Sequence, residues 1–246
     1  MTIPCKTALR LLMLIVAVST LSGCNITRMV PDDEYLLRRN ELEVDNKSFD
    51  KSVLTSYYRQ KSNRTIFHSY SLYLATYNFA HLGHERRWKS WLARVVGEEP
   101  VIYDSGMVVR TVNQFNIILR NNAYYNSSVS YSVSKKKKKA VVHYNVQLGT
   151  PTQISNVYFT IHDTVLEPLI ASDTAATLLK HGGMFTLEVL QKERDRITKQ
   201  VRSNGYYQFS PELIRYSIDT MNYKAAVEVI VERPTVQLPD GTLRKS

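Results

Sequence analysis

Few residues of this chain are spaced as catalytic or metal-binding groups usually are. The nearest approach to a metal motif is the run HLGHE, from His81 to Glu85. A zinc peptidase helix needs the spacing H-E-x-x-H, which places its ligands and base on one face, and this run lacks that spacing. The chain also has no G-x-S-x-G motif and no glycine-rich phosphate loop. The carboxylates Asp163, Glu188 and Asp195 fit helix caps and solvated helix faces, so we expect no enzyme, no metal and no cofactor.

The residue with the clearest chemistry is Cys24, which follows a secretory signal peptide over residues 1–23. Positive residues at the start precede an apolar run from Leu11 to Val18 and then small residues. That run is shorter than the roughly 20 residues that a helix needs to cross a bilayer. The tetrapeptide LSGC, which ends at Cys24, resembles the lipobox of bacterial lipoproteins, in which cleavage precedes the cysteine and its thiol and amine are acylated. The alternative is an ordinary cleaved signal with an unrelated cysteine.

Acylation at Cys24 would hold the mature chain at a membrane without crossing it. Each buried CH₂ of an acyl chain contributes about 0.8 kcal/mol, and several chains together hold stably. The other cysteine, Cys5, leaves with the signal, so the mature chain cannot form an internal disulfide.

The net charge of +10 is scattered along the chain except for the five lysines Lys135–Lys139. No helix carries a basic stripe, so we expect no nucleic-acid partner. The lysine run is typical of a solvated hairpin tip that also protects an edge strand from non-specific pairing. Contact with anionic head groups or with an acidic partner is the functional alternative.

An octapeptide is written twice, as NNAYYNSS over 121–128 and as SNGYYQFS over 203–210. Each copy follows an amphipathic helical pattern and precedes an alternating one. Gly205 suits the left-handed conformation that ends a helix. Ala123 replaces glycine in the first copy, and we expect Asn122 to take the left-handed conformation there.

The repeat predicts an α+β fold of two tandem β-α-α-β-β modules, each a three-stranded sheet packed on a helix pair. Equivalent positions of the last strands lie 83 residues apart, with one residue of slippage in the hairpin. The expected segments are a tether over 24–39, module 1 over 40–149 with a helical insert at about 63–97, module 2 over 150–234, and a linker over 235–246. The expected elements include a strand at 40–44, a helix after Asp50, a hairpin at the lysines, a strand at 152–161, helices ending near Lys180 and Val201, and strands at 213–217 and 227–231.

The ordered motifs resemble a known family. A lipobox cysteine, VPDDEYLL, EEPVIYD, a helix with NNAYYN and a hairpin, VQLGTP, and a helix with SNGYYQF resemble the periplasmic POTRA region of the BamA/TamA outer-membrane assembly group. The lipid-anchored form is similar to TamL of Bacteroidetes-type bacteria. Members of that group end in a membrane β-barrel, and the residues after Pro234 are too few for one.

The resemblance implies a lipid-anchored, periplasm-facing protein of the outer membrane that helps to assemble or translocate outer-membrane proteins. Its partners would be outer-membrane lipid through Cys24, barrel or assembly-machinery proteins, and an inner-membrane translocation component. The mechanism would be β-augmentation, in which a client strand pairs with a sheet edge. The expected pairing residues are Val129, Tyr131, Val133, Leu213, Arg215 and Ser217.

Two other functions fit the sequence. One is a structural adaptor that docks a single envelope partner. The other is a lipoprotein that binds lipid or glycan through the aromatic insert from Tyr70 to Trp91, although an aromatic stripe at helical spacing is more typical of a core.

Overall fold

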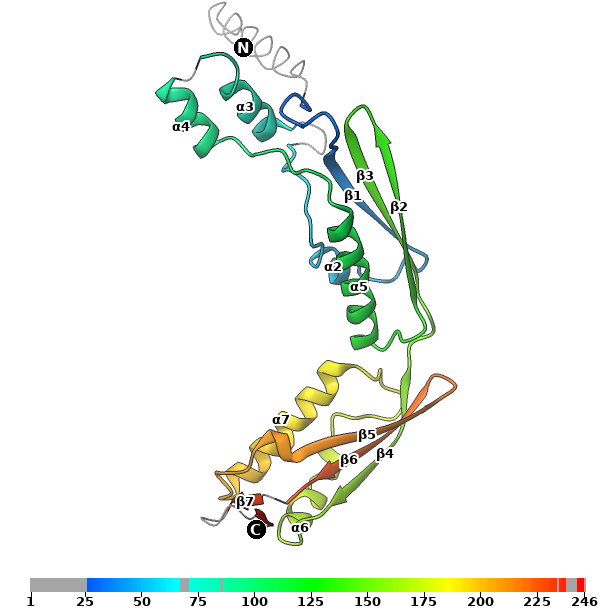
Figure 1. The fold of residues 1–246 in the computed structure, drawn as a ribbon. Helices are drawn as coiled ribbons and strands as arrows, with labels where there is room; N and C mark the ends of the chain where they lie inside the picture. Colours follow the sequence, from blue (N-terminus) through cyan, green and yellow to red (C-terminus); the bar gives the residue numbers. More distant parts are fainter. Residues whose placement is uncertain (1–25, 67–70, 85, 234, 238–242, 246) are drawn as a thin grey trace, which may run out of the picture. The chain divides into compact units, whose positions relative to one another are not determined.

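The structure is a computed structural model that describes residues 26–66, 71–84, 86–233, 235–237 and 243–245 (Figure 1). The chain is α+β and divides into two compact units. The first comprises Met1–Gln114 with Val129–Val146, and the second comprises Phe115–Ser128 with Gln147–Ser246. The predicted signal peptide, its cysteine Cys5 and the predicted lipid attachment residue Cys24 lie outside the described residues.

The first unit is built on a three-stranded sheet with the strand order β1-β3-β2. Its strands are β1 (Leu36–Val44), β2 (Ser128–Lys136) and β3 (Lys139–Gln147). The central strand β3 pairs in parallel with β1 and joins β2 through a two-residue turn. Alternate residues of β3 are buried while their neighbours are not, which is the period-2 pattern of a sheet with one covered face.

Strand β1 begins at Leu36, four residues before the predicted start, so the end of the predicted tether belongs to the sheet. Leu36 and Leu37 are almost fully buried, and the N–H of Leu36 donates to the carbonyl of Lys138 at 2.9 Å. The two leucines interrupt the polar–apolar alternation because both are covered, which hides the strand start from a pattern of period two.

Helices cover one face of the first sheet. They are α2 (Ser52–Thr55) and the first part of α5 (Ser105–Asn121), as Figure 1 shows. The ring of Tyr58 lies 5.4 Å from that of Tyr144 on β3, so the segment after α2 packs on the sheet. The helix predicted after Asp50 is α2, which is only four residues long. The insert forms two short helices, α3 (Leu72–Ala80) and α4 (Arg87–Val95).

The second unit repeats the plan with the strand order β4-β6-β5. Its strands are β4 (Gln153–Ile161), β5 (Ile214–Met221) and β6 (Lys224–Val231), and β4 again runs parallel to the central strand. Helices α6 (Leu166–Ala171) and α7 (Leu187–Ser203) lie on one face. The core between them contains Ile154, Leu166, Ile170, Leu179, Phe185, Leu190, Ile197, Val201, Phe209, Ile214, Ala225, Val227, Val229 and Val231.

Helix α6 ends at Ala171, although the sequence predicts a helix to about Lys180. A short 3-10 turn, Thr174–Ala176, follows it. The buried carboxylate of Glu193 on α7 then accepts hydrogen bonds from the hydroxyl of Thr177 at 2.9 Å and from the N–H of Leu178 at 2.8 Å. These bonds hold the chain away from a helical path, since the Leu178 N–H no longer bonds four residues back.

Strand β5 begins after another 3-10 turn, Pro211–Leu213, so Leu213 lies outside the strand in which it was predicted. Pro211 fixes φ and has no N–H, which favours a turn at this point. The strand then continues four residues beyond the predicted end, to Met221. The turn residues Lys137 and Asn222 lie 85 positions apart, so the predicted repeat with one residue of slippage is wrong at the hairpin tips.

The two copies of the octapeptide end their helices in the same way. Gly205 has φ +100°, as predicted, and Ala123 has φ +73°. The prediction that Asn122 takes the left-handed conformation is therefore wrong. Ala123 is fully buried, and its carbonyl accepts a bond from the N–H of Thr152 at 2.8 Å, so its surroundings hold it in place. The side-chain amide of Asn122 instead donates to the carbonyl of Ile118.

A small antiparallel pair, β7 (Thr235–Gln237) and β8 (Leu243–Lys245), lies in the segment predicted as a linker. Within the described parts of the chain, none of the helices has the length and apolar character needed to pass through a bilayer.

Candidate strand-pairing site

Each sheet has two edge strands, and the first strand of each unit is partly covered along its outer edge. On β1, the N–H of Leu37 donates to the carbonyl of Val101 at 2.8 Å, and Leu36 forms an isolated antiparallel bridge with Ile102. The amide of Asn40 donates to the carbonyl of Gln60 at 2.8 Å. A segment of the chain itself therefore occupies the place of a fourth strand beside β1.

Strand β4 is covered in the same manner at its start. The N–H of Ile154 donates to the carbonyl of Gly183, and the N–H of Gly182 donates to the carbonyl of Ile154, both at 2.8 Å. Gln153 forms an isolated antiparallel bridge with Met184. The two units thus protect the corresponding edge although the covering segments differ in sequence.

The opposite edges, β2 and β5, have no recorded backbone partner on their outer side among the residues that the structure describes. Within the described ranges, every recorded backbone hydrogen bond of these two strands goes to the neighbouring strand of the same sheet. An open edge has a row of N–H and C=O groups that another strand can bind. The fold therefore separates one partly covered edge from one open edge in each unit.

The tight turns show which backbone groups point outward. In the turns, Lys137 and Lys138 have φ +48° and +56°, and Asn222 and Tyr223 have φ +50° and +60°. Positive φ at both central residues is the type I′ turn of a two-residue hairpin. The residues that flank such a turn bond to each other, and along the ladder bonded pairs alternate with pairs whose groups point away.

On β2 this alternation leaves the backbone groups of Val129, Tyr131 and Val133 pointing away from β3. In the same alternation the backbone groups of the intervening serines face β3. The three residues expected to pair with a client on this strand are the ones whose backbone groups are outward.

On β5 the register runs Ile214 opposite Val231 to Met221 opposite Lys224. The outward groups then belong to Tyr216, Ile218 and Thr220, together with Ile214, while the backbone groups of Arg215 and Ser217 face β6. The carbonyl of Leu213 already accepts a bond from the N–H of Glu232 at 2.8 Å. The predicted residues Leu213, Arg215 and Ser217 therefore flank the outward positions rather than occupying them.

Side chains on the helix side of β5 are held firmly near the middle of the strand. The hydroxyl of Tyr216 donates to the carbonyl of Leu190 at 2.7 Å, and the guanidinium of Arg194 lies over the Tyr216 ring at 5.4 Å. Burial raises the pKa of the Tyr216 hydroxyl, so it stays a hydrogen-bond donor. Ile218 is 41% exposed, and a strand paired with β5 would meet its apolar side chain.

Two lysines at the tip of the first hairpin contact other side chains of the same unit. The ammonium of Lys138 forms an ion pair of 2.5 Å with Asp32, and this hydrogen bond lowers the pKa of the Asp32 carboxyl. The ammonium of Lys135 lies 4.7 Å from the ring centre of Tyr35 and 5.1 Å from that of Tyr103. The tip is therefore fixed to the segment that precedes β1.

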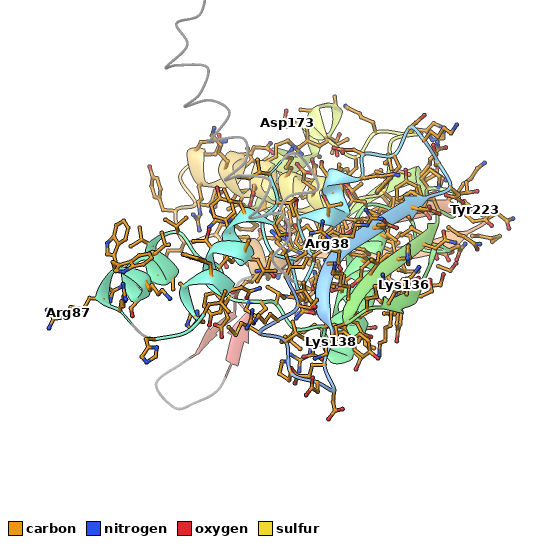
Figure 2. The ribbon with its side chains drawn as sticks, turned by 90° about the horizontal axis from the view of Figure 1, so that it is seen from above. Arg38, Arg87, Lys136, Lys138, Asp173 and Tyr223 are labelled. Atoms are coloured by element: carbon orange, nitrogen blue, oxygen red, sulfur yellow. The ribbon has the colours of Figure 1, made fainter. Side chains whose placement is uncertain are left out.

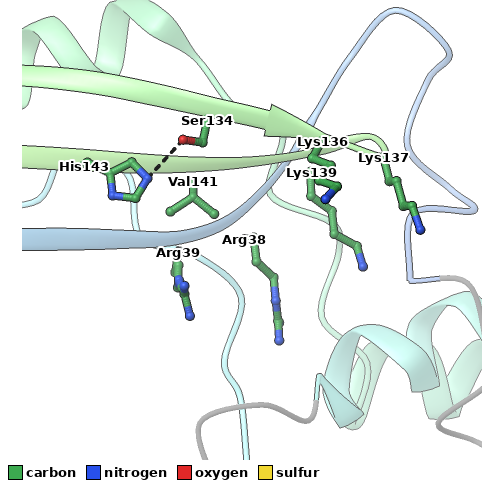
Figure 3. A pocket seen from close by; sticks show the side chains of 8 residues that line it. All are labelled: Arg38, Arg39, Ser134, Lys136, Lys137, Lys139, Val141 and His143. Carbon is green, nitrogen blue, oxygen red and sulfur yellow. Dashed lines mark hydrogen bonds between the residues drawn. The ribbon is translucent and has the colours of Figure 1, made fainter.

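The remaining tip lysines line a shallow hollow of about 450 Å³ on the open face of the first sheet (Figure 3). It is lined by Arg38, Arg39, Ser134, Lys136, Lys137, Lys139, Val141 and His143. Two of its members contact one acidic side chain, since Arg39 pairs with Glu41 at 2.5 Å and Nδ1 of His143 lies 2.7 Å from the same carboxylate.

Two carboxylates named from the sequence, Asp163 and Glu188, have structural roles. Asp163 accepts bonds from the N–H groups of Val165 and Leu166, as a helix cap does. Glu188 pairs with Lys192 on an exposed face of α7. Among the described residues, no three His, Cys, Asp or Glu side chains lie together as metal ligands. The sequence patterns missed Glu193, which lies buried against Arg196 at 2.9 Å.

Comparison with known proteins found no matching family model and no matching curated protein. Similar solved structures are POTRA domains. POTRA1-2 of the periplasmic domain of Omp85 from Anabaena matches 80% of this chain and 94% of its own length, at 14% identity and a TM-score of 0.32. POTRA3-5 of Haemophilus influenzae BamA matches 83% of this chain and 100% of its own length, at 10% identity and a TM-score of 0.31.

The N-terminal domain of Omp85 from the cyanobacterium Thermosynechococcus elongatus matches 80% of this chain at 10% identity and a TM-score of 0.34, and the chain spans 62% of its length. TM-scores below 0.5 at these identities show neither membership of a family nor a shared activity. The arrangement of two similar α+β units is seen directly in the strand orders of this chain.

Proposed function

We propose that this chain is a lipid-anchored pair of POTRA-type modules that binds extended strands of outer-membrane proteins during their assembly or translocation. The bound segment pairs with β2 or β5 through backbone hydrogen bonds, as in β-augmentation. Pairing of this kind tolerates many sequences, because the backbone groups are the same in every client. The strands of transmembrane barrels alternate apolar and polar residues, which suits the pleat of an edge strand.

The observation that carries this proposal is the difference between the edges of each sheet. The chain covers the start of β1 and β4 with its own segments and leaves β2 and β5 open in the described residues. Open edges are a risk for aggregation, and soluble proteins commonly protect them. An edge that stays open twice, at the same place in a repeated unit, is explained if it binds a partner.

The pairing residues in this proposal are Val129, Tyr131 and Val133 on β2 and Tyr216, Ile218 and Thr220 on β5. Their N–H and C=O groups are outward in the register given by the two type I′ turns. Tyr131 is 43% exposed and Ile218 is 41% exposed, so each also has apolar surface for the side chains of a bound strand.

The attachment in this proposal is acylation of Cys24 after removal of residues 1–23, which places the chain at the periplasmic face of the outer membrane. The proposed form is similar to the lipoprotein TamL. Its support is the order of the signal segment and LSGC in the sequence. Metabolic labelling with a radioactive fatty acid should mark the wild-type chain and leave a Cys24→Ser chain unlabelled.

The test of strand pairing uses a photo-crosslinking amino acid at Tyr131 or Ile218 in the full chain, expressed in bacteria that assemble outer-membrane proteins. We expect crosslinks to many different newly made barrel proteins from both positions. The matched control is Tyr207, an aromatic residue that is 79% exposed but lies in the turn after α7, outside the edge strands.

Two results would contradict the proposal. Crosslinks from Tyr207 equal in number and kind to those from Tyr131 would show that contact does not depend on the edge. A single discrete partner at both edges would identify a structural adaptor instead of a binder of client strands.

A further inference from the structure

Helix α4 of the insert carries an exposed apolar stripe. Trp88, Trp91 and Val95 are 50%, 54% and 58% exposed, and no residue of α4 in the structure is buried. At about 100° per residue these three side chains fall within about 60° of the helix circumference. Two tryptophans and a valine on one narrow face would ordinarily be covered in a folded protein.

Basic residues flank this stripe, because Arg87 and Arg94 lie beside it on the helix circumference. Arg86, Arg87, Lys89 and Arg94 are the charged residues between Glu85 and Glu98. Figure 2 shows the side chain of Arg87 extending away from the ribbon. The next acid, Glu98, is engaged by Arg64 through an ion pair of 3.4 Å and a backbone bond of 3.0 Å.

The stripe is held in place by the neighbouring helix α3. The ring of Trp88 lies 6.3 Å from that of Phe79, which is itself partly exposed and extends the apolar face. The ammonium of Lys89 donates to the carbonyl of Leu82 at 2.5 Å and lies 5.8 Å from the Phe79 ring. The N–H of Glu98 donates to the carbonyl of Tyr73 at 3.1 Å, which ties the end of α4 back to α3.

We propose that α4 docks on the surface of a bilayer that contains anionic phospholipid, with its apolar stripe among the upper acyl chains and its arginines at the phosphates. An amphipathic helix with tryptophan on one face and basic residues beside it is suited to the membrane interface. Tryptophan favours the level of the head groups because its ring is both apolar and a hydrogen-bond donor.

Charge complementarity selects an anionic surface over other occupants. A plane of negative charge can neutralise Arg87 and Arg94 at the same time, and each basic residue near such a surface strengthens binding roughly fivefold. With about 1.5 Å of rise per residue, the nine residues of α4 extend over roughly 14 Å. A helix of this length is too short to cross the hydrocarbon core of about 30 Å, so in this proposal it lies along the surface. This docking is independent of strand pairing at β2 and β5.

The chain offers a direct probe, because Trp88 and Trp91 are its two tryptophans. The full-length protein is purified from bacterial envelopes. It is then reconstituted either into vesicles that mix phosphatidylglycerol with an excess of phosphatidylcholine or into vesicles of phosphatidylcholine alone. Brominated acyl chains then quench any tryptophan that enters the bilayer. We expect strong quenching and a blue-shifted emission in the anionic vesicles, with both effects reduced by high salt because salt screens the charges.

The matched variants change charge without touching the apolar stripe. Arg87→Gln with Arg94→Gln should lower the ratio of docked to undocked α4 about 25-fold, from two contributions of roughly fivefold each. Arg110→Gln with Arg120→Gln removes two exposed arginines from α5 and should leave the quenching unchanged.

Quenching that is absent in anionic vesicles would overturn the proposal, and so would equal quenching in both vesicle types. An emission shift on adding a soluble oligosaccharide to the protein in detergent would assign the stripe to carbohydrate instead. Binding of a strand peptide to β5 serves as the separate readout for the proposed function, because Arg87→Gln with Arg94→Gln should leave it intact.

Discussion

Proline substitution on β5 tests the direction of each backbone N–H. Proline removes an N–H and is tolerated in a sheet only where that group faces away from the neighbouring strand. Ser217 bonds to the central strand in the register described above, whereas the N–H of Ile218 is outward. Ser217→Pro should therefore damage the fold, and Ile218→Pro should damage only the pairing of a client.

The magnitudes follow from what each change removes. Ser217→Pro removes one ladder bond and leaves the carbonyl of Glu228 without its donor, which together cost about 2–4 kcal/mol. Ile218→Ala removes part of a side chain that is already substantially exposed, at a cost of about 1 kcal/mol. The free energies of unfolding of Ile218→Pro and Ile218→Ala should agree within about 1 kcal/mol, because both variants lose the isoleucine side chain and neither loses a β5–β6 hydrogen bond.

Urea unfolding followed by circular dichroism gives the stabilities, and fluorescence anisotropy of a labelled ten-residue alternating peptide gives the binding. We expect Ile218→Pro to weaken binding at least about tenfold relative to Ile218→Ala, since it removes one intermolecular bond and places a ring against the incoming strand. Equal peptide affinity for these two variants would refute strand addition at β5. Equal stability of Ser217→Pro and Ile218→Pro would refute the register.

Two further predictions concern the helix ends and the lysine tip. Gly205→Ala should lose about 1–2 kcal/mol of stability in urea unfolding, because alanine is strained at φ +100° although a Cβ there meets no atom within 4 Å. The reciprocal change Ala123→Gly should stay within about 1 kcal/mol of wild type, since relief of strain offsets a lost buried methyl and a more flexible unfolded chain; a loss as large as that of Gly205→Ala would contradict this reasoning. In an NMR pH titration, the Asp32 carboxyl should titrate below its ordinary pKa, so the contribution of its contact is present above the unfolded pKa and is lost as the pH falls through the folded pKa. Lys138→Met should raise the pKa of Asp32, and an unchanged titration would mean that the ion pair does not form in solution.

The alternation of polar and apolar residues was sufficient to predict the two central strands and the repeated plan. Val142, Tyr144 and Val146 are buried while the residues between them are not, and Val227, Val229 and Val231 behave alike. The direction of each edge backbone could not be predicted, because it depends on where the type I′ turn lies. Such turns usually contain Asn-Gly or Asp-Gly, and here they contain Lys-Lys and Asn-Tyr.

Burial decided the remaining differences between sequence and structure. Ala123 accepts a left-handed conformation because its carbonyl has a partner in Thr152. Glu193 occupies a position between Leu190 and Ile197 on the apolar stripe of α7, and a charged residue there was a signal that its carboxylate is buried and paired. The exposure of Trp88 and Trp91 could not be read from their spacing, because a core stripe and a surface stripe have the same period.

The order of strands has a consequence for how the chain folds. In each three-stranded sheet the central strand is synthesised last, so the first strand has no strand partner in its own sheet until the final hairpin emerges. Leu36 pairs with Lys139, which lies 103 residues later in the chain, and Gln153 pairs with Lys224, which lies 71 residues later. The longer separation between the paired strands of the first unit adds only about 0.3 kcal/mol to the free-energy cost of loop closure. The helical insert therefore has little effect on the cost of pairing β1 with β3. Two-residue hairpins close within microseconds, and each one would then act as the template that captures the strand made earliest.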